Sequence, residues 1–299
     1  MVDIALPVPG RPYVTLEAGA GERASDVSAD LILDLYREHG ALLLRGFPFD
    51  LDSFSAFTDG FCSSSVFNES PDRLLLDEAR NIQSVNGGLK PFPLHPELSR
   101  EPWKPDVCFF CCLEPPRELG QTTVCDGAEI VRALPAEVRD GLAAHRLIYV
   151  QAASPDTLAY WLGTPTPDDA RLKAPPAECP YRFVRTPQGI MRVFTRPALH
   201  RTMFGDRLAF GNFLLFARYF HGRPNFPILD DGRPVPERWI EAVKSVSDDL
   251  TAPIAWRKGD LIMLDNTRFM HGRTAIVEDD TRLIASYFGY LKDAPRNPE

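Results

Sequence analysis

The sequence predicts a mainly β protein with peripheral helices, built on a double-stranded β-helix core of the jelly-roll, cupin-like kind. Two observations carry this prediction. From about residue 80 onward, short apolar runs alternate with Pro and Gly turns, a pattern typical of all-β sandwiches and barrels. The 28 prolines among 299 residues also suit loops that join strands better than they suit a helical bundle. We expect a single domain over residues 1–299.

The first sixty residues predict two strands and two helices. A strand is expected at 13–16 and another at 41–46, where an apolar run ends at glycine. Ser28 is the expected N-cap of a helix over 29–39, and Gly40 follows it at the position where helices commonly end. A second helix is expected over 51–61, packed on the sheet through its phenylalanines.

The remaining elements are also expected as apolar runs bounded by Pro and Gly. Strands are expected at 81–85, 107–113, 122–125, 148–151, 189–194, 254–256, 261–264 and 282–290. Helices are expected at 128–134, 136–145 and 234–246. Residues 154–180 are rich in proline with weak periodicity, and a long irregular segment in a compact domain is often a lid or binding insert. Trp161 and Arg171 are the candidates in this segment for closing over a substrate, but simple loop packing is the better-supported interpretation of both.

Composition narrows the range of partners. The formal charge is -8 and the sequence pI is about 5.4, so no overall basic field exists to hold a nucleic acid or an anionic membrane. The N-terminus lacks a basic segment followed by a long apolar one, and no apolar run reaches membrane-spanning length. We therefore expect a soluble, cytoplasmic protein that acts on a small molecule.

The six cysteines are expected to be reduced thiols. Cys108-Phe109-Phe110-Cys111 has the spelling of a CxxC motif, but it lies inside the apolar run 107–113. Zinc or redox motifs of this type need a turn or a partner pair, whereas free cysteine is commonly a small buried residue. We interpret these cysteines as part of the core.

Two histidines and a carboxylate predict a metal centre. His95 precedes Glu97 by two residues, and residues at this spacing in a strand point the same way, with Pro96 pointing outward. His271 lies in the stretch that opens with Gly259-Asp260 and passes through Asp265-Asn266. Two imidazoles and one carboxylate on one face of an octahedron are the ligands of non-heme Fe(II) oxygenases. Taken singly, each histidine also has an ordinary structural interpretation.

Arg282 completes the pattern. It begins the expected strand 282–290, which we expect to run beside the strand that carries His271. An α-keto acid that chelates the iron needs a cation for its distant carboxylate, and arginine provides a two-pronged partner for it. A surface arginine is the alternative interpretation.

These residues belong to a wider resemblance. The stretches 94–97, 115–116, 120–126, 259–273 and residue 282 resemble, in the same order, the Fe(II)/2-oxoglutarate dioxygenases of the taurine dioxygenase (TauD/TfdA-like) family. The likeness leans to the clavaminate synthase-like and amino-acid hydroxylase branch, and 41–47 and 230–236 are also similar to stretches found there. It spans most of the chain.

The resemblance implies cofactors and residue roles. The cofactors are Fe(II), 2-oxoglutarate and O2. His95, Glu97 and His271 are the implied iron ligands, while Thr122 and Arg282 are the implied 2-oxoglutarate residues. The sequence departs from the family pattern in two places. The carboxylate ligand is Glu rather than the commoner Asp, and Leu119-Gly120-Gln121-Thr122 stands where the family often has Gly-Gly-Glu-Thr. Thr122 is therefore chosen over Thr123 by its spacing from His95.

The implied activity is hydroxylation of an unactivated C–H bond. The resemblance suggests a small polar substrate in specialised metabolism, an amino acid that is either free or bound to a carrier protein. Candidate substrate-binding residues are Asn81, Gln83, Asn86 and Arg273, each of which also has an ordinary structural explanation. Desaturation or cyclisation by the same oxidant, a zinc-dependent hydrolase with the same ligands, and a non-catalytic jelly-roll binding protein are the alternatives. The sequence does not specify the oligomeric state.

Overall fold

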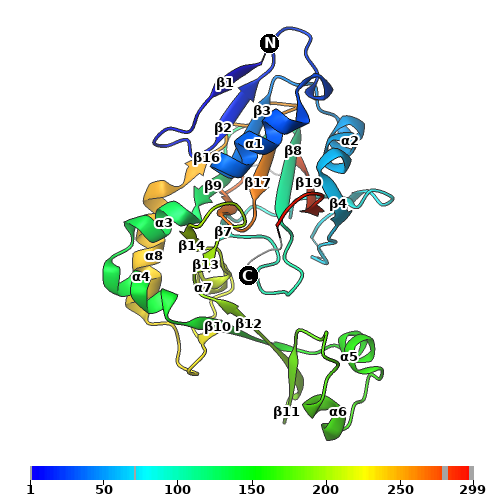
Figure 1. Cartoon of the computed structure of the whole chain (residues 1–299), viewed down its shortest axis with the longest axis vertical. Helices are drawn as coiled ribbons and strands as arrows, with labels where there is room; N and C mark the ends of the chain where they lie inside the picture. Colours follow the sequence, from blue (N-terminus) through cyan, green and yellow to red (C-terminus); the bar gives the residue numbers. More distant parts are fainter. Residues whose placement is uncertain (1, 71, 278–281, 296–299) are drawn as a thin grey trace.

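The computed structural model describes residues 2–70, 72–277 and 282–295 (Figure 1). Two β-sheets form the body, and a third sheet extends from it with two short helices at its far end. Helices cover the outer faces of the body. The expectation of a mainly β protein with peripheral helices is therefore confirmed.

The large sheet has nine strands within the described residues. Strands β2 and β3 are parallel and the other pairs are antiparallel. Its strands in spatial order are β1 Asp3–Ala5, β2 Val14–Glu17, β3 Ala41–Arg45, β17 Leu261–Asp265, β8 Val107–Glu114, β19 Leu283–Leu291, β6 Ile82–Ser84 and β5 Leu75–Asp77, with β4 Cys62–Ser65 also paired to β19.

The small sheet has four antiparallel strands and faces the large one. Its strands in order are β16 Ala252–Pro253, β9 Thr122–Asp126, β18 Phe269–Arg273 and β7 Phe92–His95. Between residues 92 and 126, and again between 252 and 291, the chain alternates from one sheet to the other along β7, β8 and β9 and along β16, β17, β18 and β19. A shared cluster of buried residues joins the two sheets, including Phe110 and Ile262 from the large sheet and Val124 and Phe269 from the small one.

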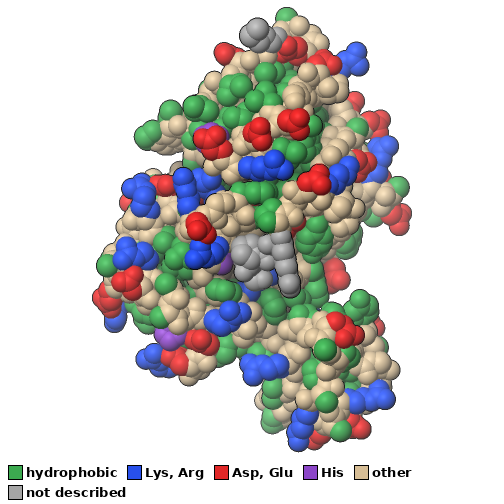
Figure 2. Space-filling model, in the orientation of Figure 1, with side chains coloured by type: hydrophobic (Ala, Val, Ile, Leu, Met, Phe, Trp, Pro, Cys, Tyr) green, Lys and Arg blue, Asp and Glu red, His purple; other side chains and the backbone are tan. Residues whose placement is uncertain are grey.

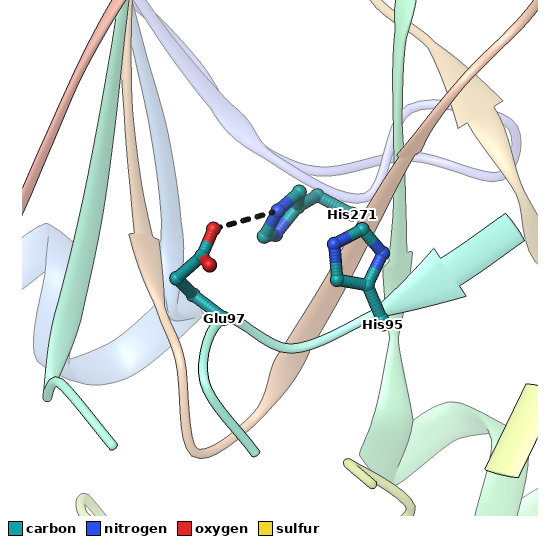
Figure 3. Close-up of side chains that lie close together, drawn as sticks. All are labelled: His95, Glu97 and His271. Carbon is teal, nitrogen blue, oxygen red and sulfur yellow. Dashed lines mark ion pairs between the residues drawn. The ribbon is translucent and has the colours of Figure 1, made fainter. Parts of the chain in front are cut away.

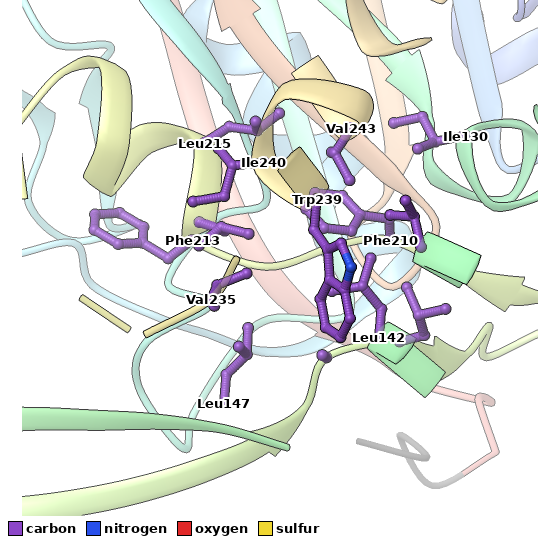
Figure 4. Packing of buried hydrophobic residues seen from close by; sticks show 14 of the residues in the cluster. Ile130, Leu142, Leu147, Phe210, Phe213, Leu215, Val235, Trp239, Ile240 and Val243 are labelled. Atoms are coloured by element: carbon purple, nitrogen blue, oxygen red, sulfur yellow. The ribbon is translucent and has the colours of Figure 1, made fainter. Parts of the chain in front are cut away.

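Strand alternation divides the core into three layers. In β8, Phe110 faces the small sheet, whereas Phe109 faces α1 Ala29–His39 and α2 Leu51–Phe61 on the outer side. The outer side of the small sheet packs against four helices: α3 Gly127–Ala133, α4 Ala136–Ala143, α7 Leu214–Tyr219 and α8 Glu237–Leu250 (Figure 4). Each fully buried large apolar side chain in these layers contributes about 1.5–3 kcal/mol to folding.

The third sheet forms an arm. Its strands are β11 Arg182–Thr186, β12 Gly189–Pro197, β10 Arg146–Ala152 and β15 Ile228–Leu229. Helices α5 Pro155–Leu162 and α6 Asp169–Lys173 lie at the end of the arm, away from the two sheets of the body (Figure 1), where they share a small buried cluster with β11. The described residues also form the hairpin β13 His200–Arg201 with β14 Leu208–Ala209 and the short helix η1 Ala24–Asp26.

Most expected elements are confirmed within a few residues of their predicted ends. Gly40 caps α1 with a positive φ of 75°, as its position predicted. Ser28 occupies the N-cap position, but its side chain accepts no capping hydrogen bond. The cysteines of 108–111 lie buried in β8, which confirms their place in the core.

Three local expectations were wrong. Residues 254–256 are not a strand, because the ladder with β9 ends at Pro253. One further hydrogen bond, from Ile254 N to Thr122 O, follows before the chain runs to the Gly259-Asp260 turn. Residues 154–180 are not irregular throughout, since α5 and α6 form there with Ser154 and Asp168 as side-chain N-caps. The strand after Arg282 pairs with β4, β6 and β8 rather than with β18, so it lies in the opposite sheet from His271.

Charges are mixed over the visible surface. Acidic and basic side chains alternate across the face shown in Figure 2, and neither sign gathers into a broad patch there. Among the described residues, no helix is both long and apolar enough to cross a lipid bilayer.

Candidate metal centre and co-substrate site

Three side chains meet between the two sheets. The ligand atoms of His95, Glu97 and His271 all lie within 4.8 Å of one another, close enough for one cation to bridge them (Figure 3). His271 Nε2 is 3.7 Å from Glu97 Oε2, and the two imidazole rings are 4.6 Å apart. The described residues contain no other such group of three or more His, Cys, Asp or Glu side chains.

Strand register brings the two histidines together. His95 ends β7 and pairs directly with His271 of β18. Their chain neighbours Leu94 and Met270 point to the helical side of the small sheet, so both imidazoles point toward the large sheet. Gly272 allows the strands this approach, because a Cβ there would lie 2.6 Å from the carbonyl oxygen of Phe92.

Glu97 reaches the site from a turn rather than from a strand. β7 ends at His95, so the expectation that His95 and Glu97 share a strand face was wrong, and Pro96 is buried rather than outward. Asn266 replaces the missing strand partner: its Oδ1 accepts from Glu97 N at 2.8 Å, and its Nδ2 donates to Glu97 O at 3.1 Å. Leu98 then turns the chain with a positive φ of 50°. Such a residue costs about 1–3 kcal/mol and persists only where its surroundings hold it.

The Glu97 carboxylate is ionised and held on two sides. Asn68 Nδ2 donates to Oε1 at 2.6 Å, and an Arg73 guanidinium nitrogen lies 3.3 Å from Oε2. Burial alone would raise the pKa of Glu97, but Arg73 and His271 together lower that pKa to about 2. The carboxylate is therefore in the form that binds a metal.

His95 is a neutral imidazole with one nitrogen committed. Its Nδ1 lies 2.9 Å from the carbonyl oxygen of Pro93, which can only accept, so Nδ1 carries the proton and Nε2 presents a lone pair. Burial, and then the neighbouring His271, lowers the pKa of His95 to about 3. Phe216 packs against the His95 ring at 4.5 Å, and Phe110 packs against the His271 ring at 4.9 Å.

This donor set fits ferrous iron. Two imidazoles and an ionised carboxylate, with the apolar rings of Phe110 and Phe216 beside them, match the two-histidine, one-carboxylate arrangement that leaves further coordination positions open. The contacts of Asn68, Arg73 and the Pro93 carbonyl orient these ligands from behind.

Thr122 and Arg282 line a small cavity beside His271. Its volume is about 40 Å³. Thr122 is buried on the inner side of β9, and its hydroxyl accepts from Trp256 Nε1 at 3.0 Å. Arg282 lies directly before β19, and its Nε donates to Gly120 O at 2.7 Å. The two residues thus come from opposite sheets and meet at the same cavity.

The four substrate candidates occupy different places. Asn86 and Arg273 line this same cavity. Arg273 also donates to the backbone carbonyls of residues 86, 88 and 90, so it ties that loop to β18. Gln83 does not line this cavity. Its side chain accepts from Asn68 N and donates to Asn68 O, so it contacts a residue that holds Glu97. Asn81 lies in a turn, where it donates to Ser65 Oγ, and it is not among the residues that line the described cavities.

A second cavity of about 310 Å³ adjoins the first. The two share Arg73, Asn86, Phe92 and His95, while Glu97 lines only the larger. The metal ligands therefore stand at the junction of the two cavities.

Sequence reasoning missed several residues at this junction. Asn68, Arg73, Phe110 and Phe216 contact the metal ligands, but the sequence analysis assigned none of them to the site. The signal present for Asn266 was its polar interruption of the apolar run before His271.

Trp161 and Arg171 lie in the arm. The Trp161 ring packs edge-on against Tyr181, and Arg171 donates to the carbonyl of Leu162. Neither lines the two cavities, so their closing over a substrate stays a prediction.

Comparison with known families agrees with this geometry. The profile of the taurine catabolism dioxygenase TauD, TfdA family matches residues 12–287. The chain belongs to the TauD/TfdA family. Its sequence matches no curated protein.

Solved structures share the TauD/TfdA fold. PvcB from Pseudomonas aeruginosa is similar with a TM-score of 0.64 and 18% identity, covering 99% of this chain and 94% of PvcB. A second PvcB structure, of an Fe, α-ketoglutarate-dependent oxygenase from an isonitrile synthetic pathway, is similar with a TM-score of 0.64 and 17% identity over the same shares. A taurine dioxygenase from Burkholderia xenovorans is similar with a TM-score of 0.64 and 15% identity, covering 99% and 91%. AAD-2, solved with Mn(II) and N-oxalylglycine, is similar with a TM-score of 0.63 and 12% identity, covering 100% and 99%.

Membership of the TauD/TfdA family establishes the enzyme class. The protein is a 2-oxoglutarate-dependent dioxygenase that uses Fe(II), 2-oxoglutarate and O2. The zinc hydrolase and the non-catalytic binding protein considered from the sequence are not supported.

Proposed function

We propose that this dioxygenase hydroxylates an unactivated C–H bond of a small polar molecule, an amino acid that is either free or carrier-bound, in specialised metabolism. The main support for this proposal is that the candidate iron ligands lie where two cavities of different size meet. This arrangement suits a co-substrate and a substrate that approach one metal from different spaces.

His95, Glu97 and His271 are the proposed iron ligands, and Thr122 and Arg282 are the proposed 2-oxoglutarate residues. The bound iron and co-substrate supply O2 activation, with release of succinate and CO2. The chain supplies the rest: Arg282 provides the charge for the distal carboxylate, Asn68 and Arg73 hold Glu97, and Phe110 and Phe216 shield the ligands from water.

Hydroxylation is the outcome that this ligand set favours. As an iron ligand, the Glu97 carboxylate would fill the coordination position that a halide takes in related halogenases. Desaturation and cyclisation remain the alternatives on the same scaffold. Asn86 and Arg273, which line the smaller cavity, are better placed to touch a bound molecule than Gln83, which acts through Asn68, or Asn81.

We also infer a double-stranded β-helix for the core of one domain that spans the chain. The support is the alternation of successive strands between the two facing sheets, together with the shared buried cluster between them. The arm is then an insert in that core.

Substrate-stimulated succinate release tests the proposal. Amino acids, free and as carrier-bound thioesters, are screened with Fe(II), 2-oxoglutarate and O2, and the products are analysed by mass spectrometry. We expect one class to raise succinate release and to gain one oxygen atom, with no stimulation in His271→Ala. A product that has instead lost two hydrogen atoms would replace hydroxylation by desaturation or cyclisation.

A further inference from the structure

The larger cavity has an aromatic wall that reaches the metal ligands. Phe92, Phe216 and Phe220 form a continuous group, with Phe220 centred 4.8 Å from each of the other two rings and Phe213 5.2 Å from Phe216. Phe216 also packs against His95. A flat or apolar group that rests on this wall is therefore held beside the iron site.

The larger cavity is also lined by Arg100. Within the described residues, the guanidinium of Arg100 makes no hydrogen bond. Its guanidinium lies over the Phe213 ring at 5.2 Å, and the nearest carboxylate oxygen, of Glu101, is 3.9 Å away. Arg73, the other arginine that lines this cavity, already donates hydrogen bonds to Glu97, Asn86 and Ser286.

Glu101 is not an effective partner for Arg100 because other groups already occupy it. Arg192 donates to Glu101 Oε1 at 2.9 Å, and the Tyr181 hydroxyl donates to Oε2 at 2.9 Å. Both come from the arm. The exposed carboxylate of Asp72 also lines the cavity, where it suits an ammonium group rather than an anion.

The arm also fixes the backbone that presents Arg100. Gln151 of β10 donates to Arg100 O at 3.4 Å, and Arg196 of β12 donates to Glu101 O at 2.6 Å. The Arg100 side chain is 41% exposed and lines the larger cavity, so it is open to solvent while its backbone is held. Because this backbone is already held, a ligand that pairs with Arg100 loses little free energy in ordering the backbone of the site.

We propose that the substrate of this site is a free carboxylic acid with an apolar or aromatic body, whose carboxylate pairs with Arg100 while its body lies on the phenylalanine wall. This inference rests on the proposed function and narrows it. A guanidinium pairs well with a carboxylate through two hydrogen bonds, whereas the acyl carbon of a thioester offers only a neutral carbonyl oxygen. Arg100 thus selects the free acid over the carrier-bound form.

Binding of three matched probes tests this inference. Affinities of 3-phenylpropanoate, its uncharged amide and its N-acetylcysteamine thioester are measured by saturation-transfer NMR on the metal-free full chain. We expect the acid to bind about tenfold more tightly than the amide or the thioester, as befits one partly exposed charge-assisted pair. In Arg100→Gln this preference should vanish, and in Arg238→Gln, a surface change on α8, it should persist.

A second variant tests the wall independently. Phe220→Ala should weaken the acid and the amide by the same factor, because it removes ring contact and no charge. Equal binding of the thioester and the acid, survival of the acid preference in Arg100→Gln, or unchanged affinities in Phe220→Ala would each overturn the inference. Because these measurements need neither iron nor turnover, their failure is distinct from a failure of the proposed hydroxylation.

Discussion

The small sheet and the loops that face it hold their parts of the site in different ways. His95, His271 and Thr122 stand on paired strands, where backbone hydrogen bonds and register set their positions. Glu97 and Arg100 stand on a turn, where side chains such as Asn266 and Arg196 hold the backbone. The positions of the residues on strands are therefore set by the fold itself. The residues on the turn depend on side-chain contacts, so substitutions there can change substrate specificity while the fold is kept.

The largest expected effect comes from the strand-borne histidines. His95→Ala or His271→Ala removes a metal ligand, and we expect succinate formation to be abolished while the fold is retained. Succinate assays with circular dichroism check this. His145→Ala is the control for loss of an imidazole, because His145 pairs with Asp230 and lines neither cavity. Substantial residual turnover in either ligand variant would show that the strands do not carry the iron.

Arg282 tests the contact between the two sheets at the smaller cavity. Arg282→Ala should weaken 2-oxoglutarate binding by about 2–5 kcal/mol, because the distal carboxylate loses its buried partner. Arg282→Lys should recover part of this loss. Arg257→Ala, which removes an exposed arginine that lines neither cavity, should leave 2-oxoglutarate binding unchanged. Unchanged co-substrate affinity in Arg282→Ala would move the anchor to Arg273.

Asn68 tests whether side chains alone hold the loop-borne ligand. Its amide donates to Glu97 at 2.6 Å, and loss of such an orienting contact typically lowers metal affinity about 10–100-fold. We expect Asn68→Ala to lower Fe(II) affinity by that factor in anaerobic titrations. The exposed Asn225→Ala is the matched control. If both variants bind iron as the parent does, the backbone of the turn suffices to place Glu97.

Asp265, the buried last residue of β17, predicts a pH dependence. Burial raises its pKa to about 6, against an ordinary 3.8, so the folded protein is penalised as this group ionises. Stability of the parent relative to Asp265→Asn should therefore fall by about 2 kcal/mol between pH 4.5 and 7.5. Urea unfolding at both pH values measures this, and an equal difference at the two values would contradict the assigned pKa.

The same contrast explains what the sequence could predict. The apolar runs of β8 and β17 predicted those strands, and Gly40 predicted the end of α1. Strands β7 and β18, whose pairing brings His95 to His271, were not among the predicted strands, so the two histidines were brought together by their residue types and by the resemblance. Glu97 was assigned to the site from the resemblance, but its turn was missed, because Asn266 binds it through a contact distant in sequence.

Other parts of the site carry no local signal. Asn68 and Arg73 belong to a polar loop without periodicity, and only the tertiary fold brings them to Glu97. The sheet that contains β19 was also misjudged, because sequence order alone does not show that successive strands β18 and β19 lie in opposite sheets. Both misses concern partners distant in sequence, because Asn68 and Arg73 precede Glu97 by 29 and 24 residues and β19 pairs with β4, β6 and β8.

The most direct test is an anaerobic titration of the Fe(II)-loaded protein with 2-oxoglutarate, followed by visible absorption. We predict a weak charge-transfer band in the parent, produced by chelation of the co-substrate to iron held by His95, Glu97 and His271, and no band in His271→Ala. A parent protein without the band, or a His271→Ala variant with an undiminished band, would contradict the assignment of this centre.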